Sequence, residues 1–161
     1  MQASSVEITK LLTSLAATPP RLAVMTKDLD PVQLHTKVSA EEWSVNEILA
    51  HLRVCAEVWG KSIVAMLTQD QPTLRYVSPR TVAKKRNYAT QEYHASLQVF
   101  SQQRSELVVR LTPLDTKAWS RRATFTGTTR GREQTIYTYV QRIIDHEAAH
   151  LAQLETLLQS K

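Results

Sequence analysis

Two histidines near the C-terminal end of the chain, His146 and His150, lie four residues apart in the sequence DHEAAHLAQLE. In an α-helix, residues four apart share a face, with about 5–6 Å between their Cβ atoms. Two imidazoles at this separation can bind one metal ion through bonds of about 2.0–2.1 Å. Both histidines fall on an apolar stripe, so they should point into the core, where unpaired polar groups are costly. The pair indicates a buried metal site; the alternative is a hydrogen-bonded pair of core residues.

A third histidine, His51, flanks the apolar face of another predicted helix. In a helical bundle this side chain could face the helix that carries His146 and His150. Three imidazoles leave a coordination position free, as catalytic metal sites do. We therefore predict that His51, His146 and His150 bind one divalent ion, for which zinc, nickel and iron are all suitable. His35 and His94 are expected to be ordinary polar residues.

The sequence from His146 to His150 also matches the HExxH pattern of zinc proteases, with Glu147 in the place of the general base. Those enzymes take a third ligand further downstream, and only 11 residues follow His150. No flanking sheet is expected either, so we exclude proteolysis. Asp145 and Glu147 could instead orient the ligand imidazoles, but solvated side chains are the favoured interpretation. Cys55, one turn beyond His51, could be a fourth ligand, but a small buried apolar role is favoured.

Four long helices must position the three histidines. Ser44 and Glu47 form a capping-box pattern that starts the clearest of them. The four long helices are predicted at residues 4–17, 45–69, 90–111 and 135–158. The first should break at Pro19 and Pro20 and resume at residues 22–25. A short helix is expected to start at Pro79. Residues 29–39 and 115–134 are expected to be loops, and the strand candidate at 124–129 is too short to count. The fold class predicted is all-α, a four-helix bundle in a single domain spanning residues 1–161.

The composition is that of an ordinary globular protein, with 42% hydrophobic and 22% charged residues. The single cysteine cannot form an intramolecular disulfide, so folding does not need an oxidising compartment. No apolar stretch reaches the roughly 20 residues that cross a bilayer. The N-terminal sequence also lacks the pattern of a signal peptide. We expect a cytoplasmic protein that does not interact with membranes.

The basic residues are concentrated in the middle of the chain, where 12 of the 20 Lys and Arg residues lie between Arg75 and Arg132. Such a patch can attract nucleic acid or a small anionic substrate. No nucleic-acid-binding motif accompanies it, so nucleic acid is not the expected partner. Four arginines that precede the last helix could hold a carboxylate or a thiol cofactor, although a solvated loop is the favoured interpretation: Arg121, Arg122, Arg130 and Arg132.

The run EEWSVNEILAHLRVCAEVW (residues 41–59), followed much later by DHEAAHLAQLE, resembles the DinB-like superfamily of metal-binding bundles, which includes the YfiT-type hydrolases. The resemblance extends over most of the chain, while residues 71–134 match only in layout. It implies a four-helix bundle of the DinB/YfiT-like type, often a homodimer, with a divalent metal bound at His51, His146 and His150. Members of known activity include isomerases and transferases that use low-molecular-weight thiols.

Two functions of different classes follow from these residues and from the resemblance. The first is a metal-dependent enzyme, either a hydrolase or a low-molecular-weight-thiol-dependent transferase, acting on a small-molecule thiol or an anionic substrate. The second is a non-catalytic bundle in which the metal staples the helices and which serves as a stress-related binding or interaction module. An enzyme needs a coordination position open to solvent, whereas a staple is closed.

Overall fold

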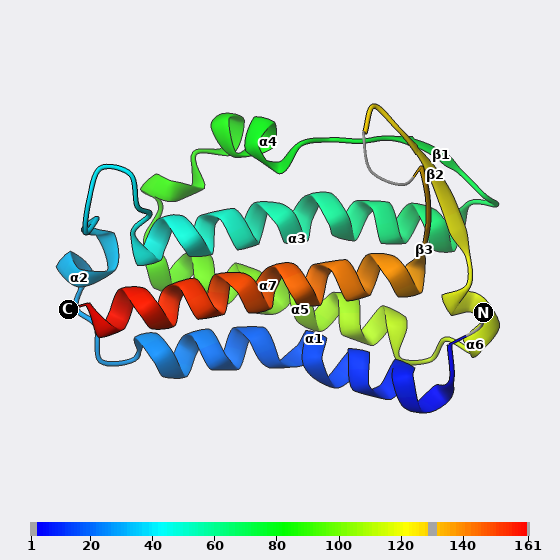
Figure 1. Ribbon diagram of the computed structural model, residues 1–161, viewed down its shortest axis with the longest axis horizontal. Coiled ribbons are helices and arrows are strands. Elements are labelled where there is room, and N and C mark those ends of the chain that lie inside the picture. The colour runs from blue at the N-terminus through cyan, green and yellow to red at the C-terminus, as the bar shows by residue number, and fades with distance from the viewer. Residues whose placement is uncertain (1–2, 129–131, 161) are drawn as a thin grey trace.

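The computed structural model describes residues 3–128 and 132–160, and four long helices lie side by side in it (Figure 1). They are α1 (Ser5–Thr26), α3 (Val45–Thr68), α5 (Tyr93–Leu111) and α7 (Ile136–Gln159). Around the bundle, α1 contacts α5 and α7, and α3 contacts the same two helices. The predicted four-helix bundle is therefore confirmed.

The connections give the bundle an uncommon direction pattern. The helices α3 and α5 run the same way, and so do α1 and α7 (Figure 1). A segment of more than 20 residues returns along the outside of α3 before α5 begins, and it contains α4 (Pro79–Arg86) and the 3₁₀ turn η1 (Tyr88–Thr90). This arrangement places α7 beside α3 in the antiparallel sense. The two helices that carry the predicted metal ligands are therefore neighbours.

Local capping explains where these two helices begin. The Ser44 side chain accepts from the Glu47 N–H at 3.1 Å, and the Glu47 carboxylate accepts from the Ser44 N–H at 2.8 Å. This is the predicted capping box. At the start of α7, Thr135 and Thr138 form an equivalent reciprocal pair. The N-terminal ends of α3 and α7 are thus fixed by side chains that accept hydrogen bonds from backbone N–H groups without a partner inside the helix.

The predicted break in the first helix at Pro19 and Pro20 is wrong, since α1 continues through both prolines. A proline at position 19 removes the N–H that would bond to the Leu15 carbonyl. In the structure that carbonyl instead accepts from Arg104 Nη1 of α5, at 3.3 Å. Packing against α5 and α7 also stabilises the helical turn of α1 that contains the two prolines.

The two segments predicted to be loops contain regular structure. Residues 29–39 include α2 (Pro31–His35), and the later segment contains α6 (Thr116–Trp119). A small sheet joins β1 (Thr73–Arg75) in parallel to β2 (Arg122–Thr126), and β2 pairs antiparallel with β3 (Glu133–Thr135). Discounting the strand candidate at 124–129 was therefore wrong. The strand is stabilised by pairing with β1, about 50 residues earlier in the chain, which the local sequence does not reveal.

The core consists of two groups of buried apolar residues. One lies at the sheet end of the bundle and includes Trp119, Phe125 and Tyr139; the other lies at the opposite end and includes Tyr93 and Phe100. Along α3 and α7 the groups meet at the histidines. None of the helices in the described part of the chain is long and apolar enough to span a membrane.

Candidate metal centre

The structure brings the three predicted ligands together. His51 projects from α3, and His146 and His150 project from α7 toward it. The Nε2 atom of His146 lies 3.0 Å from Nε2 of His51 and 3.1 Å from Nε2 of His150. The rings of His51 and His150 are also adjacent, with centroids 4.8 Å apart. The Nε2 atom of His146 therefore contacts those of both His51 and His150. Among the described residues, the group whose donor atoms all lie within 4.8 Å of one another is His51, Cys55 and His146, and it does not include His150.

Each of the two contacts that His146 Nε2 makes has a length expected for a pair of ligands on one metal ion. With metal–nitrogen bonds of about 2.05 Å, a tetrahedral ion holds two imidazole nitrogens about 3.3 Å apart, and an octahedral ion about 2.9 Å apart. The two observed Nε2–Nε2 distances lie between these values. Hydrogen bonding alone does not satisfy His146, because a neutral imidazole Nε2 carries either one proton or one lone pair and serves one partner at a time.

The tautomer of His150 is fixed by a neighbour on the same helix. Its Nδ1 lies 2.8 Å from the side-chain oxygen of Gln153, which can only accept, so Nδ1 carries the proton. The lone pair is then on Nε2, the atom that faces the other histidines. Ligand histidines in metalloproteins commonly donate their second nitrogen in this way. The sequence signal for Gln153 was its position three residues after His150, and the sequence analysis missed it.

Burial keeps two of the imidazoles neutral. Desolvation, reinforced by the neighbouring His150, lowers the pKa of His51 and of His146 to about 4. The guanidinium of Arg80 on α4 contributes to the shift at His51, and Arg142 contributes at His146. Neutral imidazole is the form that binds metals, so His51 and His146 can bind an ion at neutral pH without first losing protons.

Aromatic rings enclose the histidines. The Trp43 ring is stacked on His150, with centroids 5.9 Å apart and planes at 11°, and it lies 5.0 Å from His51. Trp59 meets the His146 ring edge to face at 4.8 Å. These indoles pack against the histidine rings, which are themselves half-buried.

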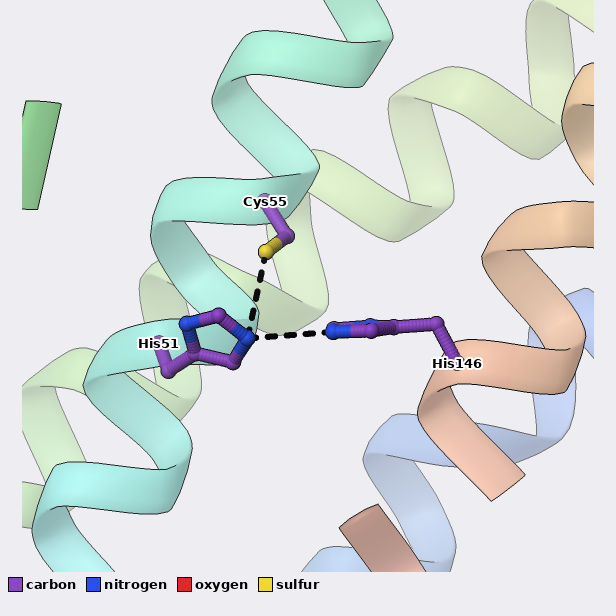
Figure 2. Close-up of side chains that lie close together, drawn as sticks. All are labelled: His51, Cys55 and His146. Atoms are coloured by element: carbon purple, nitrogen blue, oxygen red, sulfur yellow. Dashed lines mark hydrogen bonds between the residues drawn. The ribbon is translucent and has the colours of Figure 1, made fainter. Parts of the chain in front are cut away.

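Cys55 offers a further donor atom. Its Sγ lies 3.5 Å from Nε2 of His51, and Figure 2 shows the thiol and the His146 ring both directed at that nitrogen. The donor atoms of His51, Cys55 and His146 all lie within 4.8 Å of one another. A tetrahedral zinc ion holds a thiolate sulfur and an imidazole nitrogen about 3.6 Å apart. Burial raises the pKa of the thiol to about 12, so without an ion it is protonated. Cys55 is thus buried as predicted, yet it is also within reach of the site.

The expectation that Glu147 is solvated is wrong. Its side chain is buried on the opposite side of α7, where it pairs with Arg104 of α5 and accepts from Thr18 Oγ1 of α1 at 2.7 Å. Burial raises its pKa, and these two partners oppose the shift. The carboxylate faces away from the histidines, in agreement with the exclusion of a protease-like role. Asp145 is exposed and accepts from Gln141.

The other sequence candidates lie elsewhere. His35 and His94 are exposed, as expected for ordinary polar residues. Arg121 donates to the carbonyls of Met66 and Gln69, and Arg122 pairs with Glu133. These two arginines hold the end of α3 and the sheet together rather than a cofactor. Arg132 is exposed, and Arg130 lies outside the described residues.

Solved structures with a similar fold include two proteins from Bacillus subtilis. YfiT, described as a probable metal-dependent hydrolase with an unusual four-helix bundle topology, gives a TM-score of 0.86 at 18% identity, over 98% of this chain and 89% of YfiT. The DinB-like protein YjoA gives a TM-score of 0.63 at 12% identity, over 94% of this chain and 90% of YjoA. At these identities the similarity establishes the fold.

A third structure, the mycothiol-dependent maleylpyruvate isomerase, gives a TM-score of 0.70 at 17% identity; the match covers 91% of this chain and 60% of that one. No curated protein sequence matches the chain. The family model of the DinB superfamily matches residues 14–154, a stretch that includes all three histidines and most of the bundle. The chain therefore belongs to the DinB superfamily.

Proposed function

We propose that this protein is a metal-dependent enzyme in which His51, His146 and His150 hold one divalent ion: zinc, nickel or iron. Its reaction is either a hydrolysis or a transfer that uses a low-molecular-weight thiol. The single observation that carries the proposal is the pair of Nε2–Nε2 contacts, of 3.0 and 3.1 Å, that His146 makes with His51 and His150. Membership of the DinB superfamily supports it, as do the descriptions of YfiT and of the mycothiol-dependent isomerase.

Both reactions need the same chemistry from the site. A divalent ion held by three imidazoles lowers the pKa of a water or thiol at its remaining position, which provides a nucleophile near neutral pH. The chain contributes the neutral imidazoles of His51 and His146, a fixed tautomer at His150 through Gln153, and the indoles of Trp43 and Trp59, which pack against the histidine rings. Arg80 and Arg142 supply positive charge next to the histidines, which favours an anionic substrate.

A second candidate function follows from Cys55. If its sulfur is a fourth ligand, the site is closed and tetrahedral, as in structural zinc sites. The bundle is then a metal-stapled binding or interaction module without catalytic activity. The 3.5 Å contact between Sγ and His51 Nε2 favours this alternative. The enzyme is our first choice, because three histidines complete the ligand set that an open site needs while the thiol remains protonated.

Cobalt(II) substitution distinguishes the metal-dependent enzyme from the closed, metal-stapled module. We expect the wild-type protein with one Co²⁺ to lack a thiolate-to-cobalt charge-transfer band and to gain one when a small thiol such as cysteine is added. The variant Cys55→Ser should behave in the same way. A charge-transfer band that is present in the wild type without added thiol and is lost in Cys55→Ser would support the closed module instead.

A further inference from the structure

A cavity of about 450 Å³ lies between α3, α4 and the small sheet, and it is not part of the histidine cluster. Its walls are mainly apolar: α3 provides Val58 and Ala65, β2 provides Phe125, and the segment from β1 to α4, which runs along the outside of α3 (Figure 1), provides Leu74, Val77 and Val82. The phenol ring of Tyr139 stacks on Phe125 at 5.2 Å and forms part of the wall. The volume is that of a site for a small organic molecule.

The residues lining the cavity carry an excess of positive charge. Four cations line it, namely Lys61, Arg75, Lys85 and Arg86, against one carboxylate, Glu57. Glu57 is already engaged by Lys61 at 3.0 Å, by Arg86 at 2.7 Å and by the Tyr88 hydroxyl at 3.0 Å. Among the described residues, no ion pair involves Arg75 or Lys85. The cavity therefore combines an apolar interior with cations that can receive an acidic group.

The cavity and the histidine cluster share the same faces of two helices. Val58 lies seven residues after His51 on α3, and Tyr139 lies seven residues before His146 on α7. Seven residues are about two helical turns, or roughly 10 Å. Both wall residues are therefore displaced from the histidines by about the same distance, and in the same direction because the helices are antiparallel.

Side chains connect the two sites. The guanidinium of Arg142 lies 5.4 Å from the Trp59 ring centroid and 6.0 Å from that of Tyr139. Trp59 in turn packs against the ring of His146. The short helix α4 also lies near both sites. The positive charge of its Arg80 acts electrostatically on His51, and its Val82 and Lys85 line the cavity. A molecule in this cavity therefore lies within two helical turns of the histidines.

We propose that this cavity binds an amphipathic organic anion, whose acidic group lies among Lys61, Arg75 and Lys85 and whose apolar body packs between Val58, Leu74 and Phe125. The binding itself needs no metal ion. Its role as the substrate or cofactor site rests on the proposed function, since the reacting end of the molecule must then extend toward the histidines.

A pair of matched probes tests the ligand class. 8-Anilinonaphthalene-1-sulfonate and N-phenyl-1-naphthylamine share their aromatic rings and differ in the sulfonate, and both become fluorescent in apolar sites. We expect the sulfonate to bind at one saturable site, about tenfold more tightly than the neutral probe, because of its charge-assisted contacts. Equal affinities, or no saturable binding of the sulfonate, would overturn the proposal.

Variants locate the binding. Ala65→Trp fills the cavity, and the double variant Arg75→Glu/Lys85→Glu reverses its unpaired charges. Each should weaken sulfonate binding at least about tenfold. The control for Ala65→Trp is Ala23→Trp, which lies in a separate groove between α1 and α5. The control for the charge variant is Lys10→Glu/Lys27→Glu, which reverses one exposed lysine in α1 and one just after it. Both controls should bind the sulfonate as the wild type does. Since Arg75 and Lys85 are exposed, the charge variant tests the proposal even if Ala65→Trp does not fold. Unchanged binding in the charge variant would overturn it.

The triple variant His51→Ala/His146→Ala/His150→Ala separates this inference from the proposed function. We expect it to lose metal and to keep sulfonate binding. Loss of probe binding together with the metal would place the probe at the histidines and overturn the inference about the cavity. A wild-type protein that binds the probe in the cavity but retains no metal would contradict the proposed function alone.

Discussion

At the scale of single residues, Gln153 controls how His150 presents its nitrogens. Its side-chain oxygen accepts from Nδ1 at 2.8 Å, so the lone pair of His150 faces His146. His146 has no such support, since its own Nδ1 is buried with no hydrogen-bond partner among the described residues. Among the three histidines, His150 is therefore the one whose orientation depends on a hydrogen bond from its Nδ1 to a neighbouring amide.

Replacing this amide tests its role. We expect Gln153→Leu to weaken metal affinity about 10–100-fold, as is typical when the partner of a ligand histidine is removed. Gln153→Glu should retain the affinity, because a carboxylate also accepts from Nδ1. The measurement is competition with a chelator of known affinity. The control is Gln141→Leu, which removes a glutamine that bonds Asp145 on the same helix. Equal losses in Gln153→Leu and Gln141→Leu would contradict the assignment.

The histidines also predict how the metal-free protein responds to pH. In the folded chain the pKa of His51 and that of His146 are about 4, against 6.5 for the unfolded residue. The unfolded state therefore binds more protons, and the free energy of unfolding should fall as the pH drops from about 6.5 to about 4. Urea denaturation in the presence of a chelator measures this. The variant His51→Ala/His146→Ala should show a shallower decline, and identical slopes would contradict the prediction.

At the scale of elements, α1 depends on a buried ion pair from two other helices. Arg104 of α5 and Glu147 of α7 are each only 3% exposed, and Arg104 also serves the Leu15 carbonyl left free by Pro19. The Thr18 hydroxyl completes the cluster by donating to Glu147. Three long helices thus meet at one polar group of residues inside an otherwise apolar core.

Breaking this pair should be costly. Arg104→Met leaves Glu147 buried without its ionic partner, and we expect a loss of about 3–5 kcal/mol in the free energy of unfolding. The double variant Arg104→Met/Glu147→Leu should recover part of this loss, because no buried charge remains unpaired. Denaturant unfolding provides the values, and Arg110→Met at an exposed position of α5 is the control. A single variant as stable as the control would contradict this account.

The elements also show what the sequence can predict. The helices α3 and α7 follow from long apolar periodicity, and the Ser44 cap follows from a local motif. The continuity of α1 depends on Arg104, some 85 residues after the prolines, and strand β2 depends on its pairing with β1. Such non-local contacts leave no signal in a local pattern. For the candidate site, helical spacing predicted that His146 and His150 share a face, while the approach of the Cys55 thiol to His51 depends on side-chain packing.

At the scale of the whole molecule, a metal ion would join α3 to α7 at the point where the two core groups meet. An ion that binds only the folded state stabilises it by about 2.7 kcal/mol when its free concentration is 100 times Kd. We therefore expect Tm to rise on adding Zn²⁺ or Ni²⁺ to chelator-treated protein. Thermal melts of the wild type and of the triple histidine variant measure this. A rise of equal size in both would place the binding elsewhere.

The resemblance to the superfamily implies a homodimer, and the sequence composition favours a cytoplasmic location; both stay predictions. Light scattering after size-exclusion chromatography should give twice the 18.3 kDa mass of the chain. A mass equal to that of one chain at micromolar concentration would contradict the dimer. The proposed histidine site does not depend on this result, because all three proposed ligands come from one chain.

The metal content of the purified protein tests the central claim most directly. Elemental analysis should find close to one divalent ion per chain in the wild type after growth with zinc, nickel and iron supplied. The variant His51→Ala/His146→Ala/His150→Ala should fold and contain none, while His35→Ala/His94→Ala should retain the ion. A folded wild-type protein that holds no metal under these conditions, or a triple variant that holds as much as the wild type, would contradict the three-histidine site.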